Sequence, residues 1–443
     1  MTKSNKGRAI ATVTAVSATA LALTACSAPA EEPTDTPEAT DQVTSEPIEL
    51  TYLHRLPDGE GMVTVQEIVD RWNADNPDIQ VNPVKFDGAS AEMTLKLETD
   101  INAGVGPCLA QVGYSEVPDM WVKGLLQDVT DFSGQYASNF AEGAFNAMAV
   151  GGSQVGLPQD TGPLVYFYNE AAFEELGLEV PTTADDFTEA AATAAEDGKY
   201  IAAFTPDEAQ NWLSGQAAAA GDAWYTATDA GWAVDTVGEG TQQVADFWQT
   251  MLDDESVYVG QRWGDGFTQA LVDGQLVGHI GPAWEAGFML DPLDGTDAEG
   301  QWRVAQLPDF GAGVMSGPDG GSGVAVMSGC EYPEQAMEFN NWFNTQVDDL
   351  ATQGLLVAAD ASVETPEKMA RQFGGQDVMA EFQAANANLN PDFVYSPGFL
   401  TLSTMNQKAD EVAAGTADVI DIFETAQADS VTALTNLGLP VAE

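Results

Sequence analysis

The chain alternates between strand-like and helix-like apolar patterns from residue 48 onward. Ile48, Leu50 and Tyr52 occupy alternate positions, which is typical of a strand. The apolar positions of residues 62–72 then fall on one face of a helix, which Asn76-Pro77 ends. A second round adds a strand that starts at residue 79, a helix over residues 93–101 and a strand over residues 109–112. Strands and helices that alternate at these intervals predict a parallel sheet with right-handed crossovers.

The alternation continues through the rest of the chain. Strands are predicted over residues 164–168, 276–280 and 302–307, and helices over residues 184–195, 244–251, 267–273 and 336–343. Thr183 is a predicted N-cap, with Asp186 three residues on as a weaker form of the capping box. Helical, Ala-rich sequence fills most of the end of the chain, and no internal repeat is evident. The length exceeds what one core usually supports, so two lobes are expected.

The first 25 residues read as a secretory signal peptide. Three basic residues precede an apolar, small-residue stretch over Ala9–Ala22, which is shorter than the ~20 apolar residues needed to span a bilayer. The run Leu23-Thr24-Ala25-Cys26 resembles the bacterial lipobox. The resemblance implies diacylglyceryl attachment to the Cys26 thiol, signal removal, and a lipid tether to the outer face of the membrane. A plain signal peptide with an incidental cysteine is the alternative.

Residues 26–47 combine the lipidated cysteine with a tether. Ser27–Pro47 is rich in Pro, Thr, Ser, Ala and acidic residues, with almost nothing to bury, so it is predicted to be disordered. Its predicted role is to hold the folded part away from the lipid. No later apolar run is long enough for a transmembrane helix.

The formal net charge of -55 argues against polyanionic partners. Removal of the signal peptide would leave 11 of the 14 basic residues against 69 acidic ones. Such a surface repels nucleic acid phosphates and anionic lipid headgroups, which argues against DNA or RNA binding. With so many carboxylates, pairs occur at every spacing by chance, so no pair is interpreted as an acid/base dyad.

Enzyme signatures are mostly absent from the sequence. The two histidines, His54 and His279, are far apart, and no HExxH, Walker or dinucleotide-binding motif occurs. Ser322 lies in GGSG, which lacks the GxSxG spacing of a nucleophile elbow. His279 lies inside the apolar strand LVGHI, where a core position is expected. We therefore predict that the protein is not an enzyme and that it binds no metal and no cofactor.

Two cysteines remain after Cys26, namely Cys108 and Cys330. In an exported protein an even pair suggests a disulfide, with two buried free thiols as the alternative.

Aromatic residues are abundant in loop-like, Gly-rich surroundings. Trp224-Tyr225, Trp263 and Trp284 all lie in such segments. Indole faces suit the C–H faces of sugar rings, and pockets that join such faces to a few fixed polar groups are the usual small-ligand design. Most tryptophans are core residues, however, so each of these could instead be structural.

Several segments, in a shared order, resemble one known family. They are ELTYLHRLPDGEGMVTVQEIVDRWNADNPDIQV, GVGPCLAQVGYSEVPDMWVKGLLQDVTDF, YFYNEAAFEELGLEVPTTADDF, FTQALVDGQLVGHIGPAWEAG, WRVAQLPDF and GPDGGSGVAVMSGCEYPEQAMEFNNWF. They resemble the extracellular solute-binding proteins of carbohydrate ABC uptake systems, related to maltose-binding protein, here as an actinobacterial-type lipoprotein. The likeness covers almost the whole chain after the tether.

The resemblance implies an α/β fold of the periplasmic-binding-protein type II, with two α/β lobes joined by three hinge crossings. Carried onto this sequence, the crossings fall near Asp160, Gln306 and Thr345. Lobe one would comprise residues 48–159 and 307–344, and lobe two residues 160–306 and 345–443. Cys108 and Cys330 would then lie on neighbouring strand ends, which favours the disulfide. Many relatives carry Asp where this chain has Cys108, so one polar contact could be missing.

The resemblance also implies ligand contacts at the carboxyl ends of the strands, where open α/β sheets bind ligands. The expected ligand-binding residues are His54, Arg55, Tyr114, Glu116, Asp160, Trp224, Trp284, Glu285, Gly320, Gly321 and Ser322. Trp224 and Trp284 would stack on sugar rings, and the glycines would bring backbone N–H groups close to hydroxyls.

The function implied is capture of a carbohydrate, most simply an oligosaccharide, and its delivery to ABC permease subunits from the extracellular face of the membrane. A monomer is the default. The alternative is a secreted glycoside hydrolase, which needs two carboxyl groups at a fixed separation. A surface adhesin is a second alternative, and it would carry an exposed apolar patch instead of a cleft.

Overall fold

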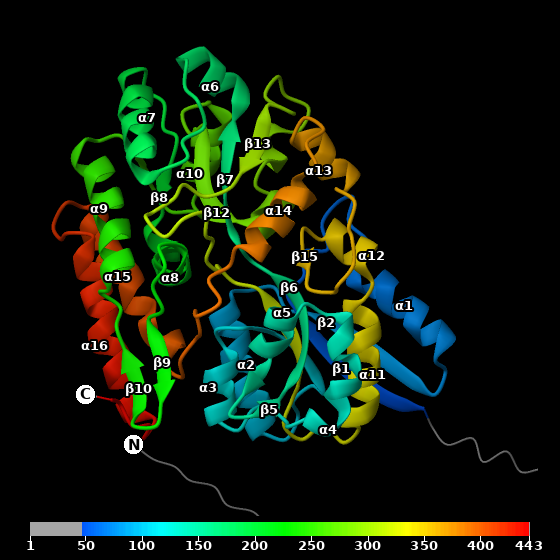
Figure 1. Ribbon diagram of the computed structural model, residues 1–443. Coiled ribbons are helices and arrows are strands. Elements are labelled where there is room, and N and C mark those ends of the chain that lie inside the picture. Colours follow the sequence, from blue (N-terminus) through cyan, green and yellow to red (C-terminus); the bar gives the residue numbers. More distant parts are fainter. Residues whose placement is uncertain (1–46, 443) are drawn as a thin grey trace, which may run out of the picture. The chain divides into compact units, whose positions relative to one another are not determined.

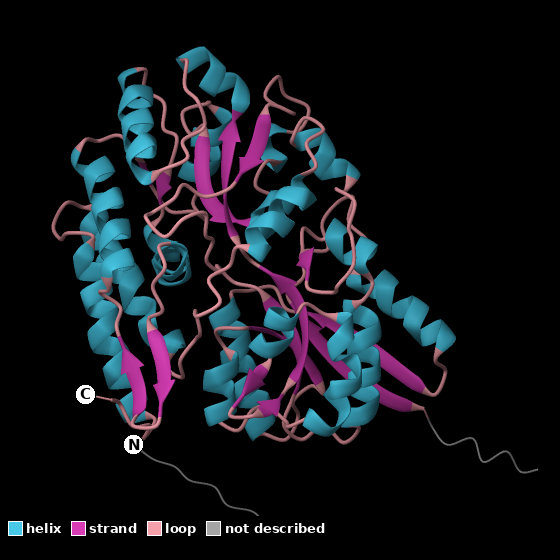
Figure 2. Cartoon of the chain, in the orientation of Figure 1, coloured by secondary structure: helices cyan, strands magenta, loops and turns pink. Residues whose placement is uncertain are grey.

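The computed structural model describes residues 47–442, so the predicted signal peptide, Cys26 and nearly all of the predicted tether lie outside the described residues. Two separate α/β sheets organise these residues (Figures 1 and 2). The helices and strands of both are distributed along the whole described chain. Among residues 47–442 no helix has both the length and the apolar character that crossing a membrane requires.

The larger sheet has six strands in the order β15-β6-β14-β3-β1-β2. Its strands are β1 (Ile48–His54), β2 (Ile79–Lys85), β3 (Leu109–Gly113), β6 (Gly156–Thr161), β14 (Ser322–Val326) and β15 (Leu356–Val357). The predicted parallel pairing is confirmed, because β1 runs parallel to both β2 and β3. β14, in contrast, lies antiparallel between β3 and β6.

Helices cover both faces of this sheet, and we call the whole assembly the large-sheet lobe. Its helices are α1 (Val65–Asp75), α2 (Ser90–Asn102), α3 (Val117–Val122), α4 (Thr130–Ser133), α5 (Glu142–Ala147), α11 (Pro333–Asn344) and α12 (Val347–Thr352). Strand alternation divides the core: Leu50 and Tyr52 face the cluster under α1 and α11, whereas Leu53 faces the cluster under α2 and α3. Thr64 caps α1 in a full capping box with Glu67.

The smaller sheet has three strands in the order β12-β7-β13, all antiparallel, with β7 (Leu164–Asn169) between β12 (Gly278–Pro282) and β13 (Trp302–Ala305). With its helices it forms the small-sheet lobe. On one face α7 (Ala184–Glu196), α8 (Ala209–Ala219), α9 (Glu239–Asp253), α15 (Thr404–Ala413) and α16 (Ile420–Asn436) share a core with Leu164 and Tyr166. On the other, α10 (Asp265–Val272), α13 (Glu367–Gln372) and α14 (Val378–Ala387) share a core with Val165 and Phe167.

Short elements complete the small-sheet lobe. They are α6 (Glu170–Leu176), β8 (Ala203–Phe204) paired with β11 (Tyr258–Val259), the hairpin β9 (Tyr225–Thr228) and β10 (Gly231–Val234), and the 3-10 turns η2 (Pro206–Glu208), η3 (Ala283–Gly287), η4 (Asp291–Leu293) and η5 (Phe399–Ser403). In the large-sheet lobe the remaining short elements are η1 (Gly134–Asn139) and the β4 (Ala149–Val150) and β5 (Ser153–Gln154) hairpin. The expected Thr183 cap is present, since its side chain accepts from the Asp186 backbone N–H at 3.1 Å. Only half of the expected capping box forms.

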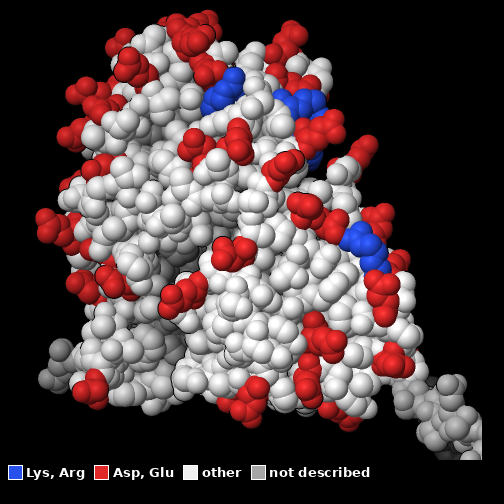
Figure 3. Space-filling view, turned by 45° about the vertical axis from the view of Figure 1, so that its right-hand side comes forward, with Lys and Arg blue, Asp and Glu red and all other residues white. Residues whose placement is uncertain are grey.

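Acidic side chains are spread over the surface, as the composition requires. On the face shown in Figure 3, acidic side chains are scattered among uncharged ones, and the few basic side chains lie close to acidic ones. Arg371, for example, pairs with both Asp294 and Glu299. No large basic patch forms on this face.

Cys108 and Cys330 form a disulfide, with 4.6 Å between their Cα atoms. The reason is the strand register: Leu109 pairs with Val326 at the ends of β3 and β14, so the flanking cysteines meet. Met327 also donates its backbone N–H to the carbonyl of Cys108 at 2.9 Å. The bridge therefore ties the late strand β14 to the early strand β3, across 222 residues of sequence.

Removal of this disulfide should destabilise the protein. Closing a loop of 222 residues restricts the unfolded chain strongly, so the double variant Cys108→Ser/Cys330→Ser should lose about 2–5 kcal/mol of unfolding free energy. Urea denaturation with and without reductant measures this. Reductant should lower the midpoint of the wild type only, and an equal drop in the double variant would contradict the prediction.

Candidate ligand-binding site

Three residues expected in the site meet where β3 and β6 end and β14 begins. Ser322 pairs with Gly113 on one side and with Asp160 on the other. The Ser322 hydroxyl donates to the Asp160 carboxylate, and the Tyr114 hydroxyl donates to the Asp160 backbone carbonyl at 2.9 Å. All three side chains are buried. Strand register, not proximity in sequence, thus brings Tyr114, Asp160 and Ser322 together.

The Asp160 carboxyl group is held in an environment that favours its neutral form. Burial raises its pKa to about 6, although hydrogen bonds from Ser322 and the charge of Arg55 act in the opposite direction. A carboxyl group with this pKa changes its charge close to neutral pH. Asp160 therefore differs chemically from the many solvated carboxylates of the surface.

Two buried glutamines extend this polar layer, and sequence reasoning missed both. Gln111 Nε2 donates to the Ser322 hydroxyl at 3.1 Å, and Gln111 Oε1 accepts from the backbone N–H of Arg55 at 2.8 Å. Gln159 Nε2 donates to Asn344 Oδ1 at 3.0 Å and to Tyr52 Oη at 3.2 Å. No sequence motif distinguishes Gln111 and Gln159. They join the polar layer because they lie near the ends of β3 and β6.

The two lobes are connected by a close backbone approach beside these strand ends. Asp319 donates its N–H to the carbonyl of Gly162 at 2.7 Å, and Tyr114 donates its N–H to the carbonyl of Gly321 at 3.2 Å. A Cβ atom at Gly162 would lie 2.3 Å from the Asp319 carbonyl oxygen. Only glycine fits at residue 162, because any side chain would push the two crossing segments apart.

Gly320 and Gly321 permit a second close approach, as their sequence suggested. Both have positive φ angles, of 82° and 84°. A Cβ at Gly320 would lie 3.1 Å from Trp284 Nε1, and one at Gly321 would lie 2.8 Å from a ring carbon of Tyr114. The glycines thus let two aromatic side chains reach the backbone beside Asp160 and Ser322.

Trp284 lies beside Trp263, a tryptophan that is not among the residues expected to bind ligand. Trp284 is in η3, directly after β12, and its Nε1 donates to the Asp319 carbonyl at 2.9 Å. Its ring is parallel to that of Trp263 within 7°, with 6.3 Å between ring centroids, and Phe288 packs near both. Trp263 is 56% exposed, unlike the core tryptophans. We call Trp263 and Trp284 the tryptophan pair.

Glu285 is buried and fully engaged within the protein. Arg262 Nε donates to Glu285 Oε1 at 2.9 Å, and Arg262 Nη2 donates to Oε2 at 2.8 Å. His279 Nε2 lies 3.2 Å from the same Oε2. Burial by itself would raise the pKa of Glu285, but Arg262 and His279 together lower it to about 2. Glu285 is therefore ionised, and Arg262 is a site residue that the sequence did not reveal.

Two further carboxyl groups flank the tryptophan pair. Trp263 Nε1 donates to Glu208 Oε1, and Asp319 lies beside Trp284 through its backbone carbonyl. Burial and the neighbouring carboxylates raise the pKa of Asp319 well above its usual value. Burial likewise raises the pKa of Glu208, to about 7. Within residues 47–442 the Asp319 carboxyl group accepts no hydrogen bond, so it is available to a ligand's donor.

Other buried polar atoms near this region lack partners in the described part of the chain. Among them are Glu116 Oε1, Thr161 Oγ1 and Tyr395 Oη. Glu116 uses its other oxygen, Oε2, to accept from the Gly113 backbone N–H at 2.8 Å. Tyr395 packs against a core cluster of each lobe. A buried polar atom without a partner costs free energy, which a ligand hydroxyl at the same position would recover.

Two further expected residues, His54 and Arg55, lie where β1 ends. His54 is the last residue of β1 and Arg55 follows it at the same sheet edge. Arg55 lies close enough to lower the pKa of both Asp160 and Glu116 against the effect of burial. Burial lowers the pKa of His54 to about 4, so its imidazole is neutral at pH 7.

Trp224 was expected to stack on a sugar ring, but the structure places it in the core. It is 1% exposed, donates from Nε1 to Thr241 Oγ1 at 3.0 Å and packs edge-on against Phe423. Its ring lies in the core of the small-sheet lobe, so it offers no free face for stacking.

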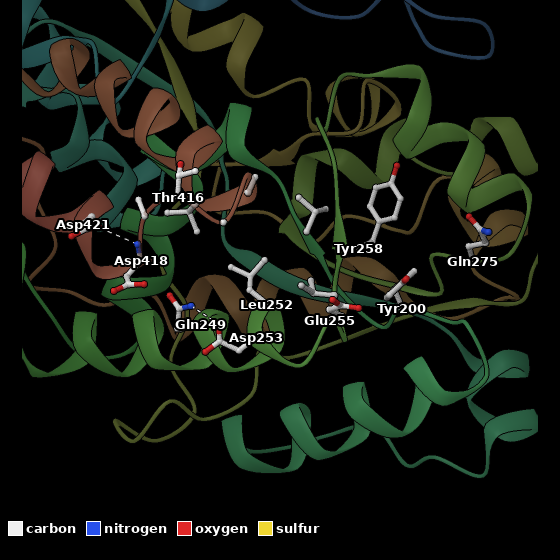
Figure 4. A pocket seen from close by; sticks show the side chains of 16 residues that line it. Tyr200, Gln249, Leu252, Asp253, Glu255, Tyr258, Gln275, Thr416, Asp418 and Asp421 are labelled. Carbon is white, nitrogen blue, oxygen red and sulfur yellow. Dashed lines mark hydrogen bonds between the residues drawn. The ribbon is translucent and has the colours of Figure 1, made fainter.

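A groove in the small-sheet lobe lies away from the expected site residues. The groove, of about 880 Å³, is formed by the end of α9, β11 and the segment between α15 and α16 (Figure 4). Side chains of Asp253, Glu255, Asp418 and Asp421 line it, together with Tyr200 and Tyr258, and none of the expected site residues does. No cluster of His, Cys, Asp and Glu in residues 47–442 has the arrangement of a metal site.

The family model of bacterial extracellular solute-binding proteins matches residues 57–347. The structure is similar to that of the galacto-N-biose/lacto-N-biose I-binding protein of an ABC transporter from Bifidobacterium longum, solved in complex with lacto-N-biose. The TM-score is 0.87 and the sequence identity 49%, covering 90% of this chain and 100% of that chain.

More distant relatives bind other sugars. The arabinooligosaccharide-binding protein of Halalkalibacterium halodurans is 24% identical over 299 residues, 63% of this chain and 64% of that protein, so the match spans less than two thirds of its length. The lactose-binding protein of Rhizobium radiobacter is 24% identical over 347 residues, 72% of this chain and 77% of that protein. The predicted type II periplasmic-binding-protein fold is confirmed, because solved structures such as the sugar-binding MalE of Xanthomonas citri share it, with a TM-score of 0.68 at 15% identity over 88% of this chain and 98% of that chain.

Gly162→Ala should disturb the crossing between the lobes. The added Cβ would lie 2.3 Å from the Asp319 carbonyl oxygen, so we expect a loss of about 2 kcal/mol or more in unfolding free energy. Gly143→Ala in α5 is the matched control, since its Cβ would meet nothing within 4 Å. Thermal unfolding measures both, and equal melting temperatures for the two variants would contradict the prediction.

Asp160→Asn should change how stability depends on pH. The folded-state pKa of about 6 lies above the ordinary 3.8, so the folded protein holds this proton more tightly. The contribution of Asp160 to the unfolding free energy is therefore greatest below about pH 4. It falls as the pH rises to about 6 and stays low at higher pH.

Denaturation at pH 4 to 8 tests this sign. The unfolding free energy of the wild type minus that of Asp160→Asn should decrease by on the order of 3 kcal/mol between pH 4 and pH 7. Asp229→Asn, an exposed loop carboxylate, is the control and should show no such trend. A flat difference for Asp160→Asn would show that burial does not raise its pKa.

Proposed function

Since the chain belongs to the family of bacterial extracellular solute-binding proteins, we propose that it captures an oligosaccharide between its two lobes and delivers it, unchanged, to an ABC permease. The observation that carries this proposal is the tryptophan pair flanked by the carboxyl groups of Glu208 and Asp319, of which Asp319 is buried and accepts no hydrogen bond within residues 47–442. Stacked indoles offer an apolar surface to the C–H face of a sugar ring, and the carboxyl groups accept from its hydroxyls.

The ligand-binding set under this proposal has two parts. Arg55, Tyr114, Glu116, Asp160 and Ser322 belong to the strand ends of the large sheet, with His54 behind them. Trp263, Trp284, Glu208 and Asp319 line the side toward the small sheet. A sugar that contacts both parts favours the arrangement in which both are close, because only that arrangement makes all the contacts.

The lobe boundaries proposed here differ slightly from those expected from the sequence. β15 pairs with β6 in the large sheet, which favours a third crossing after Val357 over one near Thr345. Leu307 and Phe310 belong to a small-sheet core, which favours a second crossing near Gly317 over one near Gln306. The first crossing, at Gly162, is two residues from the expected Asp160.

The setting of the protein is also part of the proposal. Lipidation of Cys26 would hold it on the extracellular face of the membrane, with residues 27–47 as the tether. The family supports an extracellular location and a permease partner. We also propose that the protein has no enzymatic activity. The alternative, a secreted glycoside hydrolase, is distinguished by whether the sugar is cut.

Lacto-N-biose is the first probe, because a protein 49% identical to this chain was solved with it. We expect lacto-N-biose to raise the melting temperature, since a ligand at 100 times its Kd stabilises the folded state by about 2.7 kcal/mol. Trp284→Ala should weaken binding at least tenfold by calorimetry. Tyr332→Ala, an exposed aromatic residue outside the site, is the control and should bind as the wild type does.

Two outcomes would overturn the proposal. One is that lacto-N-biose, lactose and arabinooligosaccharides all leave the melting temperature unchanged. The other is that chromatography after incubation finds shorter sugars, which would support the hydrolase.

A further inference from the structure

We propose that the buried Arg262–Glu285 ion pair is a positioning element, which sets the spacing and the parallel alignment of the tryptophan pair and thereby tunes sugar affinity. In this proposal Glu285 does not contact the ligand, contrary to the expectation from sequence. The statement about affinity rests on the proposed function; the statement about ring alignment does not.

Each member of the ion pair is the chain neighbour of one tryptophan. Arg262 precedes Trp263 in the loop after β11, and Glu285 follows Trp284 in η3. The two hydrogen bonds of 2.9 and 2.8 Å between guanidinium and carboxylate therefore join the two segments that carry the tryptophan pair, each at the residue next to a tryptophan. Because this bidentate contact fixes orientation as well as distance, it fixes the relative placement of the two tryptophans.

The guanidinium also supports the rings themselves. Its carbon lies 4.7 Å from the centroid of the Trp263 ring and 4.4 Å from that of Phe267. Trp263 is further held by Asp207, which accepts from the backbone N–H groups of Arg262 and Trp263 at 2.8 and 3.2 Å. Although Trp263 is 56% exposed, its ring is also held by the hydrogen bond from its Nε1 to Glu208 Oε1. These contacts order it before any ligand arrives, which reduces the entropy that binding must overcome.

Stability alone does not explain this ion pair. The side chains of Arg262 and Glu285 are only 7% and 3% exposed. Burying two charges costs desolvation free energy that their attraction roughly offsets, and apolar residues of similar volume often serve a core as well. What apolar side chains cannot supply is a fixed mutual orientation of the two loops. The contribution specific to the ion pair is therefore geometric.

The test uses Arg262→Lys, which keeps the charge but cannot make the bidentate contact. Arg371→Lys is the matched control, because Arg371 forms a similar pair with Glu299 on the surface, away from the tryptophan pair. The first readout is near-ultraviolet circular dichroism without sugar. We expect Arg262→Lys to change the tryptophan bands, as stacked rings lose their alignment, and Arg371→Lys to leave them unchanged.

The second readout is the affinity for lacto-N-biose, measured by calorimetry. Arg262→Lys should weaken binding at least tenfold in the wild-type background but less than twofold in the Trp284→Ala background, because the residue acts through that ring. Equal losses in both backgrounds, or unchanged tryptophan bands, would overturn the proposal. A merely structural role would lower affinity equally in both.

A further variant covers the case in which Arg262→Lys does not fold. The double variant Arg262→Met/Glu285→Met removes both charges together and should fold, but with altered tryptophan bands. Wild-type bands in this variant would refute the positioning role. If the wild-type protein binds none of the sugars, the proposed function fails while the spectral comparison still decides the alignment of the rings.

Discussion

The close backbone contact between Gly162 and Asp319 is the constraint on which the rest of the site depends. At this point the chain leaves the large sheet after β6 and returns to it before β14, and the two segments share a hydrogen bond of 2.7 Å. The same Asp319 accepts from Trp284 Nε1 at its backbone carbonyl, and its side chain is buried. A side chain at residue 162 would separate the segments and with them the polar strand ends and the tryptophan pair.

The chemistry gathered at this point favours a neutral, hydroxyl-rich ligand. Asp160, Glu208 and Asp319 all have raised pKa values because burial disfavours their charged forms. Arg262, the basic residue at the tryptophan pair, is already committed to Glu285. An anionic ligand would meet repulsion from these carboxyl groups, and Arg262 would not offset it because it is bound to Glu285. Sugar hydroxyls, in contrast, donate to carboxyl oxygens whatever their charge, and the indole face supplies the apolar contact.

Much of the fold could be predicted from sequence because its strands alternate between two cores. The period-two pattern of Leu50 and Tyr52 found β1, and the helical pattern through Trp72 found α1, within a few residues of their bounds. Periodicity does not name a strand's partner, however. The antiparallel placement of β14 between β3 and β6 follows from long-range pairing, and the sequence prediction covered only the parallel part.

The site could be predicted only where a residue follows a recognisable strand. Tyr114, Asp160 and Ser322 could be predicted in this way. Glu208, Arg262 and Asp319, in contrast, lie in loops or a short 3-10 turn, and their role depends on distant segments. Trp224 and Trp284 look alike in sequence, since both sit in Gly-rich surroundings. What separates them is Thr241 and Phe423, which enclose Trp224 from α9 and α16.

The unpaired groups of the site determine how a ligand would act on the protein. Trp263 is exposed, and Glu116 Oε1 and Tyr395 Oη have no partner within residues 47–442, so these groups can bond to a ligand. Tyr395 packs on cores of both lobes, and its hydroxyl is therefore sensitive to their separation. A ligand shifts the arrangement of the lobes only by the difference in free energy between its contacts in each arrangement. Groups that a sugar satisfies solely when both lobes are close supply that difference, whereas a sugar bound by one lobe alone would leave the arrangement unchanged.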